Sequence, residues 1–175
     1  MDLTNFIRTV PDFPEPGILF RDVTTLFGNP NAFQSMISSF EKNWQGKDIE
    51  CIAGIDARGF IIGGALAHHM GVGFVPVRKK GKLPYKTIEE DYALEYGTAT
   101  LELHVDAISS GSKVLVVDDL IATGGTAIAT INLIKRLEAS VVGCSFLVDL
   151  PDLKGSGRIK EMGIEVKSLC EFEGE

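Results

Sequence analysis

The sequence contains little cysteine and little histidine. Its 175 residues include only three of each. Because Cys51, Cys144 and Cys170 are odd in number and widely spaced, they fit neither a disulfide framework nor a CxxC metal site. We therefore expect reduced thiols and a cytoplasmic location. The histidines lack metal-ligand spacing, and two of them are expected at a helix C-terminus, where the helix dipole favours such side chains.

Positive charge and long apolar runs are also scarce. Lys and Arg number 17 against 24 Asp and Glu, which gives a net charge of −7. Nucleic-acid-binding proteins normally carry a basic surface, so we expect no nucleic-acid partner. Without an apolar run of about 18 residues or a secretory signal, we expect no membrane partner either. A chain of 175 residues with 45% hydrophobic residues predicts one folded domain spanning residues 1–175.

Apolar runs of strand length alternate with amphipathic stretches of helix length. Helices are expected over 32–44 with Asn31 as N-cap, over 60–70 closed by Gly71, and from the end of loop 118–126 to about 138. Strands are expected over five ranges: 51–55, 74–77, 114–117, 141–148 and 164–169. This alternation predicts an α/β fold with a mostly parallel, twisted sheet flanked by helices.

Two segments fall outside this alternation. Residues 11–17 hold three prolines within six residues, so they cannot form the interior of a helix and are expected to be an ordered surface segment. Residues 78–105 alternate in polarity around Gly97, which predicts a β-hairpin or a flexible flap inserted into the α/β core.

The strongest chemical signal lies at residues 114–126. Four aliphatic residues precede Asp118 and Asp119, and a helix then opens with Ala122, Thr123, Gly124, Gly125 and Thr126. Glycines let backbone N–H groups approach an oxyanion, hydroxyls add donors, and the helix N-terminus adds about half a unit of positive charge. We predict a site for a phosphate monoester, with the aspartates at the hydroxyls of its sugar. The alternative for the loop alone is a tight strand-to-helix turn capped by aspartate.

Two further strand ends carry residues suited to anions. One strand is followed by Asp56, Ala57, Arg58 and Gly59, and another by the cations Arg78, Lys79, Lys80 and Lys82. Ligands of parallel sheets sit beyond the carboxyl ends of the strands, so we expect these groups beside an anionic ligand. Taken alone, Arg58 and Gly59 fit equally well a surface arginine and a packing glycine, and the cation run fits a solvated face.

Together these segments resemble the adenine phosphoribosyltransferases of the type I phosphoribosyltransferase family. The resemblance runs in order from about residue 1 to 150 and is carried by 16–23, 55–60, 78–84, 94–97 and the phosphoribosyl-pyrophosphate signature at 114–126. It implies the type I phosphoribosyltransferase fold with an N-terminal hood (about 1–30) and a flexible flap (about 79–104). It also implies transfer of the 5-phosphoribosyl group from 5-phosphoribosyl 1-pyrophosphate to N9 of adenine, forming AMP and pyrophosphate in purine salvage.

The resemblance implies a role for each segment. The loop 122–126 holds the 5′-phosphate, and Asp118 and Asp119 hydrogen-bond the ribose hydroxyls. The pyrophosphate is received by the loop 56–59, where a cis non-proline peptide is expected, together with three cationic side chains: Arg78, Lys79 and Lys82. Mg²⁺ is carried mainly by the pyrophosphate, with no side chain expected to bind it directly. A homodimer is implied, with the region 78–82 near its interface.

The resemblance also implies the adenine site and the catalytic groups. Adenine lies between Phe20 and Leu150, with backbone groups around Leu19 and Arg21 at the edge of the base. Catalysis is assigned to Glu95 as acid/base together with Arg58, Asp118 and Asp119, while Tyr96 contacts the substrate or seals the flap. Taken alone, Phe20 fits a core phenylalanine and Glu95 a solvent-facing strand residue, and Leu150 carries no signal.

Three alternative functions are weighed against this one. Transfer to guanine or xanthine usually goes with a lysine that reads the 6-oxo group and an aromatic residue after the last strand, whereas residues 148–151 here are Val-Asp-Leu-Pro. A non-catalytic phosphoribosyl-binding regulator would need a DNA-binding module, for which we expect no room. An unrelated nucleotide-binding α/β domain would make the cation cluster incidental.

Overall fold

The computed structural model describes residues 1–94 and 97–174. Within these residues the central sheet has seven strands: β3 (Cys51–Ile55), β4 (Gly73–Lys79), β5 (Thr87–Ala93), β6 (Thr98–His104), β7 (Lys113–Ile121), β8 (Ser140–Asp149) and β9 (Val166–Glu171). Their order across the sheet is β5-β6-β4-β3-β7-β8-β9. Neighbouring strands pair in parallel along the part of the sheet β4-β3-β7-β8-β9, whereas β6 pairs antiparallel with both β4 and β5. The predicted α/β fold with a mostly parallel sheet is confirmed.

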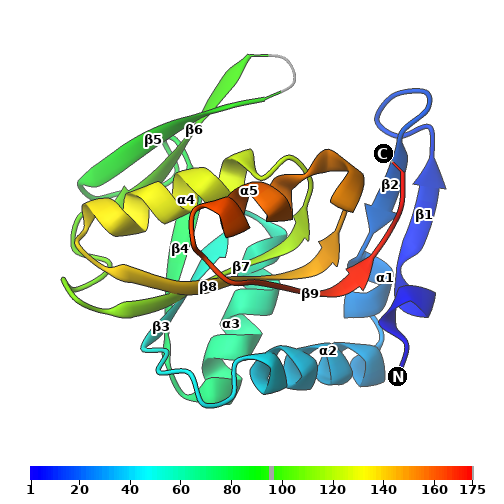
Figure 1. Cartoon of the computed structure of the whole chain (residues 1–175), viewed down its shortest axis with the longest axis horizontal. Coiled ribbons are helices and arrows are strands. Elements are labelled where there is room, and N and C mark those ends of the chain that lie inside the picture. Colours follow the sequence, from blue (N-terminus) through cyan, green and yellow to red (C-terminus); the bar gives the residue numbers. More distant parts are fainter. Residues whose placement is uncertain (95–96, 175) are drawn as a thin grey trace.

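Helices cover both faces of this sheet. The helices α2 (Pro30–Asn43) and α3 (Arg58–Met70) lie on one face, and α4 (Gly125–Arg136) and α5 (Gly155–Glu161) lie on the other (Figure 1). In β7, Leu115 and Val117 pack into the cluster on the α2/α3 side, whereas Val114 and Val116 pack into the cluster on the α4 side. Because successive strand residues point to opposite faces, a strand buried on both faces is an unbroken apolar run.

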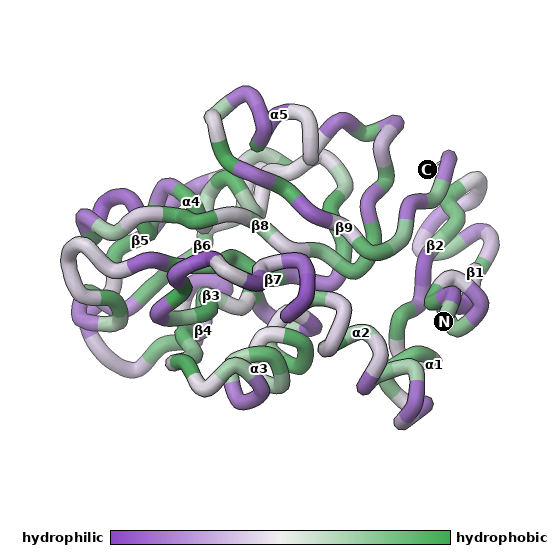
Figure 2. The backbone as a smooth tube through the Cα atoms, turned by 60° about the horizontal axis from the view of Figure 1, so that its bottom comes forward, coloured by the Kyte–Doolittle hydropathy of each residue, from purple (hydrophilic) through white to green (hydrophobic). Residues whose placement is uncertain are grey.

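Most element boundaries differ slightly from the sequence prediction. The N-cap of α2 is Asn29, not Asn31, because Pro30 occupies the first helical position and the Asn29 side chain accepts the N–H groups of Asn31 and Ala32. The helix α3 begins at Arg58, two residues before the predicted start, and its C-cap is Gly71 as predicted. Figure 2 shows it as a mostly hydrophobic or neutral tube. The helix α4 ends at Arg136, and β9 is shifted toward the C-terminus by two residues.

The largest boundary difference is in β7. The sequence predicts a strand over 114–117 and a loop from 118, but the strand continues through both aspartates to Ile121. Parallel pairing with β8 extends as far as Ile121 opposite Asp149, so the ladder holds the two polar residues in extended backbone. The aspartates therefore lie on a strand and not on a mobile loop.

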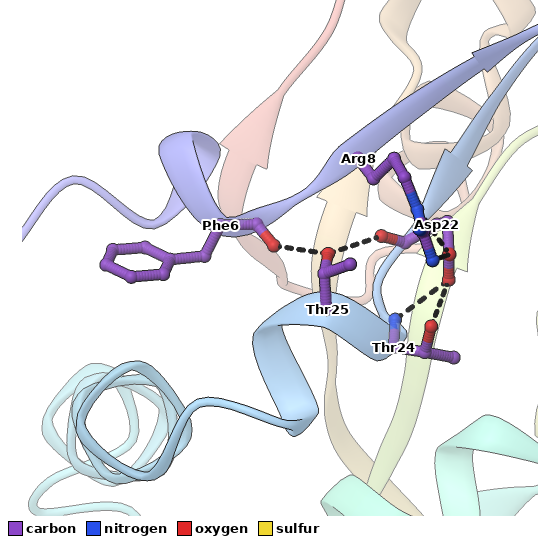
Figure 3. Close-up of polar contacts among 5 residues, drawn as sticks. All are labelled: Phe6, Arg8, Asp22, Thr24 and Thr25. Carbon is purple, nitrogen blue, oxygen red and sulfur yellow. Dashed lines mark hydrogen bonds and ion pairs between the residues drawn. The ribbon is translucent and has the colours of Figure 1, made fainter.

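The N-terminal segment folds as a small separate sheet. After a 3-10 helix, η1 (Leu3–Phe6), strands β1 (Arg8–Pro11) and β2 (Leu19–Asp22) pair antiparallel, and a short helix α1 (Thr24–Phe27) follows. Hydrogen bonds around Asp22, Thr24 and Thr25 join these elements (Figure 3). The sequence predicted an ordered surface segment here but not the two strands.

The β1–β2 hairpin and the β5–β6 hairpin lie at opposite ends of the molecule (Figure 1). The predicted hairpin within residues 78–105 is thus present, formed by β5 and β6. A second 3-10 helix, η2 (Pro151–Leu153), connects β8 to α5. Among the described residues, none of the helices combines the length and the apolar character needed to cross a bilayer.

Candidate functional site

Two adjoining cavities open near the carboxyl end of β7. Their volumes are about 190 Å³ and about 340 Å³. Asp118, Leu120 and Thr126 line both cavities, so a single elongated ligand can occupy the two together. This is the edge at which parallel sheets bind ligands.

The smaller cavity is formed by the predicted phosphate loop. Its lining includes Ala122, Thr123, Gly124, Gly125 and Thr126. The loop runs directly into α4, which begins at Gly125. Backbone N–H groups in the first turn of a helix have no partner within the helix, and they form the positive end of its dipole. The cavity is therefore suited to a phosphate group.

Helix α5 supports the phosphate loop from behind. The N–H of Gly155 donates to the carbonyl of Ala122 at 3.0 Å, and the guanidinium of Arg158 donates to the carbonyl of Thr123 at 2.6 Å. A Cβ at position 155 would lie 2.7 Å from the backbone nitrogen of Gly124, so only glycine allows this approach. No role beyond completing the sheet was predicted for residues after Pro151, and Lys-Gly-Ser-Gly at 154–157 was the available signal.

The larger cavity brings together two other predicted segments. Asp56, Ala57, Arg58 and Lys79 line it with Asp118 and Asp119. The peptide bond between Asp56 and Ala57 is cis, as expected. Gly59 is not in the lining: a Cβ there would lie 2.8 Å from the carbonyl oxygen of Val117, so this glycine lets α3 begin against β7.

An ion pair and a raised pKa dominate the electrostatics of the larger cavity. The Nε–H of Arg58 donates to the carboxylate of Asp119, whose side chain is 6% exposed. Burial and the neighbouring charge of Asp119 raise the pKa of the Asp118 carboxyl well above its usual value. The site thus holds one carboxylate paired with arginine beside one carboxyl group that protonates readily.

The cationic residues at 78–82 contact different partners. Arg78 donates to Asp56 at 3.2 Å and to the carbonyl of Lys82 at 3.2 Å, while Lys80 pairs with Glu89 at 2.6 Å. Lys79 reaches the cavity lining, whereas Lys82 is tied through its backbone.

A buried glutamate fixes this basic segment, and sequence reasoning missed it. Glu102 on β6 is 3% exposed and accepts the backbone N–H groups of Lys82 and Leu83 at 2.8 and 2.6 Å. Burial alone would raise the pKa of Glu102, but hydrogen bonds from backbone N–H groups lower it overall. A glutamate between two leucines in a strand is typical of a solvent-facing position, so the sequence pattern concealed it.

The residues predicted to bind adenine are not among the described residues that line the two cavities. The ring of Phe20 stacks edge-on against Phe13 with centroids 5.1 Å apart, and the guanidinium of Arg58 lies 5.9 Å from the Phe20 centroid. Leu19 is 37% exposed, and the N–H of Leu150 donates to the carbonyl of Ile121 at 3.0 Å. The side chain of Arg21 turns toward the C-terminal tail. Glu95 and Tyr96 lie outside the described residues.

Comparison with known proteins identifies the family. Residues 24–169 match the phosphoribosyl transferase domain. The chain is 59% identical to an adenine phosphoribosyltransferase of Maricaulis maris over 174 residues, which cover 99% of both chains. The crystal structure of the adenine phosphoribosyltransferase of Rhodothermus marinus has 52% identity and a TM-score of 0.92, with 97% of this chain and 96% of that chain covered.

A more distant solved structure carries ligands. The adenine phosphoribosyltransferase of Saccharomyces cerevisiae, complexed with an imino-altritol bisphosphate and adenine, has 41% identity and a TM-score of 0.89. The alignment covers 95% of this chain and 96% of that one. With its fold, its phosphate loop and these similarities over nearly its full length, the chain belongs to the adenine phosphoribosyltransferase family, one of the type I phosphoribosyltransferases.

Proposed function

We propose that this chain transfers the 5-phosphoribosyl group from 5-phosphoribosyl 1-pyrophosphate to N9 of adenine, forming AMP and pyrophosphate. The observation that carries this function is the pair of adjoining cavities, one at the phosphate loop and one lined by Arg58 and Lys79. Asp118, which lines both, lies where the ribose of such a donor would join its two charged ends. The activity is that of the family to which the chain belongs.

The smaller cavity receives the 5′-phosphate. The N–H groups at the start of α4 and the hydroxyls of Thr123 and Thr126 supply its donors. Asp118 and Asp119 accept hydrogen bonds from the ribose hydroxyls. These bonds fix the sugar between its two phosphate-bearing ends. Positioning of this kind removes much of the entropic barrier to a reaction between two bound substrates.

The larger cavity stabilises the departing pyrophosphate. The C1–O bond to pyrophosphate breaks as the C1–N9 bond forms on the opposite face, with inversion at C1 and positive charge on the ribose in the transition state. Arg58 and Lys79 offset the negative charge that develops on the leaving group. The proton on N9 leaves the base during this step, and Glu95 stays the predicted group that assists it.

We further propose that Mg²⁺ accompanies the pyrophosphate. The donor set fits this ion, because Asp118 and Asp119 supply carboxylate oxygens in the larger cavity. Magnesium sites commonly use one or two carboxylates together with substrate phosphates and water. The two aspartates would hold the ion through ribose hydroxyls or water, and the ion would neutralise charge on the leaving group.

A cytoplasmic homodimer completes the proposal. The three cysteines are free thiols, and burial raises the pKa of Cys144 to about 12 and that of Cys170 to about 11. Reduced, unreactive thiols are typical of a reducing compartment.

The homodimer rests on the family resemblance, with the region 78–82 near the interface, and sedimentation of the purified chain tests it.

Product formation from four purine bases tests the proposed activity. The purified chain is incubated with the donor, Mg²⁺ and adenine, guanine, hypoxanthine or xanthine, and nucleotides are separated by chromatography. We expect AMP from adenine and at most trace product from the 6-oxopurines. Asp118→Ala with Asp119→Ala should abolish turnover in a folded protein, whereas the exposed Asp106→Ala should leave it unchanged. Full activity of the double variant would refute the assignment of these groups.

A further inference from the structure

The C-terminal tail lies beside β2 of the hood. Figures 1 and 2 both place the C-terminal end next to this strand, although more than 140 residues separate them in the sequence. We call residues 172–174 the strap. They follow β9 directly and carry one aromatic side chain, Phe172.

Arg21 is the residue of β2 that the strap contacts. Its guanidinium lies 4.4 Å from the centroid of the Phe172 ring, within the range of a cation–π interaction. Its Nη2 donates to the carbonyl of Glu173 at 3.2 Å, and its Nη1 donates to the hydroxyl of Thr9 on β1 at 2.7 Å. One side chain thus joins both strands of the hood to the strap.

The stacking partner matters because part of this guanidinium is buried without a hydrogen bond. The Nε of Arg21 is shielded from solvent and has no hydrogen-bond partner among the described residues. Burying a charged donor costs free energy unless another interaction compensates for it. The face of the Phe172 ring is the compensating group here, so its loss should release the Arg21 side chain.

The other side of the strap is attached near the expected adenine site. The N–H of Phe172 donates to the carbonyl of Asp149 at 3.1 Å, and the N–H of Gly174 donates to the carboxylate of Asp152 at 2.9 Å. Asp149 and Asp152 flank Leu150 and Pro151 in the sequence. The strap therefore spans from the side chain of Arg21 to the backbone next to Leu150.

We propose that Phe172 is a positioning residue for the nucleobase. This role rests on the proposed function and on the predicted adenine site between the Leu19–Arg21 backbone and Leu150. The strap holds β2 at a fixed separation from Leu150, so the width of the adenine site depends on Phe172. No hydrogen bond among the described residues joins the strap to the phosphate loop or to Arg58, so we expect its loss to affect adenine binding more than donor binding.

Steady-state kinetics of three variants test this role. In Phe172→Leu we expect the KM for adenine to rise about tenfold, while the KM for the donor and kcat stay within about twofold of the wild type. Phe172→Tyr keeps the aromatic ring and should behave like the wild type. The control is Phe33→Leu, which removes a half-buried ring that stacks on Phe27 at 5.8 Å. It should lower thermal stability without changing the KM for adenine.

A double-variant cycle with Arg21→Met separates coupling from general damage. Because Phe172 acts through Arg21, the double variant should bind adenine no more weakly than Arg21→Met alone. An unchanged KM for adenine in Phe172→Leu, or an equal rise in both KM values, would overturn the strap's role while the activity stands. Failure of the wild type to form AMP would instead overturn the proposed function.

Discussion

Arg58, in the first turn of α3, donates its Nε–H to the carboxylate of Asp119 near the end of β7. The two side chains differ in exposure, with 45% of Arg58 accessible and 6% of Asp119. Removing one partner of such a pair leaves a charge that is buried and unpaired. Losing the ion pair should cost more free energy at Asp119 than at Arg58, because the arginine still reaches solvent or a bound anion.

The variant Arg58→Gln should lose both this pairing and a cation of the leaving-group site. We expect kcat/KM for the donor to fall about a hundredfold, the range seen when one transition-state donor is removed. Pyrophosphate affinity, measured by calorimetry, should fall as well. Lys113→Gln is the control, because Lys113, at the start of β7, also forms an ion pair, with the exposed Asp48. Unchanged pyrophosphate affinity in Arg58→Gln would contradict the role of this arginine.

The variant Asp118→Asn should be more stable than the wild type and much less active. The pKa of Asp118 is raised by burial and by the charge of Asp119, so the ionised form destabilises the folded protein at pH 7. A neutral amide removes that cost, and we expect Tm to rise by about 2–4 °C.

The stability gain should depend on pH. Below the ordinary pKa of an aspartate, both the folded and the unfolded wild type carry a neutral carboxyl group, so the two proteins should converge. Calorimetric scans between pH 3 and pH 8 measure this difference. A gain in Tm that does not change with pH would argue against ionisation of Asp118 as its cause.

The variant Arg158→Gln should weaken binding of the donor and leave adenine binding intact. Arg158 holds the carbonyl of Thr123 from α5, which fixes the phosphate loop. A charge-assisted hydrogen bond of this kind contributes about 1.5–3 kcal/mol, but this side chain is exposed, so we expect the KM for the donor to rise about threefold to tenfold. Lys160→Gln removes the same charge from the same helix and should have no effect.

The strand-and-helix order was predictable because both cores follow simple periodicity. Val114 to Val117 alternate between the two faces of the sheet, and a run that is apolar on both sides has few other structural solutions. The phosphate loop was predictable for a related reason, since glycines and hydroxyls directly after such a strand have a specific chemical use. These features are local in the sequence.

The parts that the sequence did not predict depend on contacts between distant residues. Glu102 looks solvent-facing until the chain brings the N–H groups of Lys82 and Leu83 to it. Gly155 looks like a loop glycine until α5 packs on Ala122, 33 residues away in the sequence. The strands β1 and β2 are short and rich in polar residues, so their pairing follows from the turn between them and not from periodicity.

Asp22 should make the hood sensitive to acid. Hydrogen bonds from the hydroxyl and the N–H of Thr24, followed by Arg8, lower the pKa of Asp22 to about 2 from its ordinary 3.8 (Figure 3). A lowered pKa means that this stabilisation is present above about pH 4 and is lost as pH falls toward 2. Asp22→Asn should therefore lower the free energy of unfolding at pH 7 by about 1–2 kcal/mol, because the neutral amide replaces charge-assisted hydrogen bonds with weaker ones.

The difference between wild type and Asp22→Asn should shrink as the pH is lowered. Urea unfolding at pH 7, 4 and 3 measures it, with the exposed Asp106→Asn as a control that should match the wild type at every pH. The aspartate accepts the N–H of Thr24 through Oδ1 and binds Arg8 through Oδ2 at 2.7 Å, and protonation weakens both contacts. A difference that stays constant from pH 7 to pH 3 would mean that these hydrogen bonds do not stabilise the ionised form.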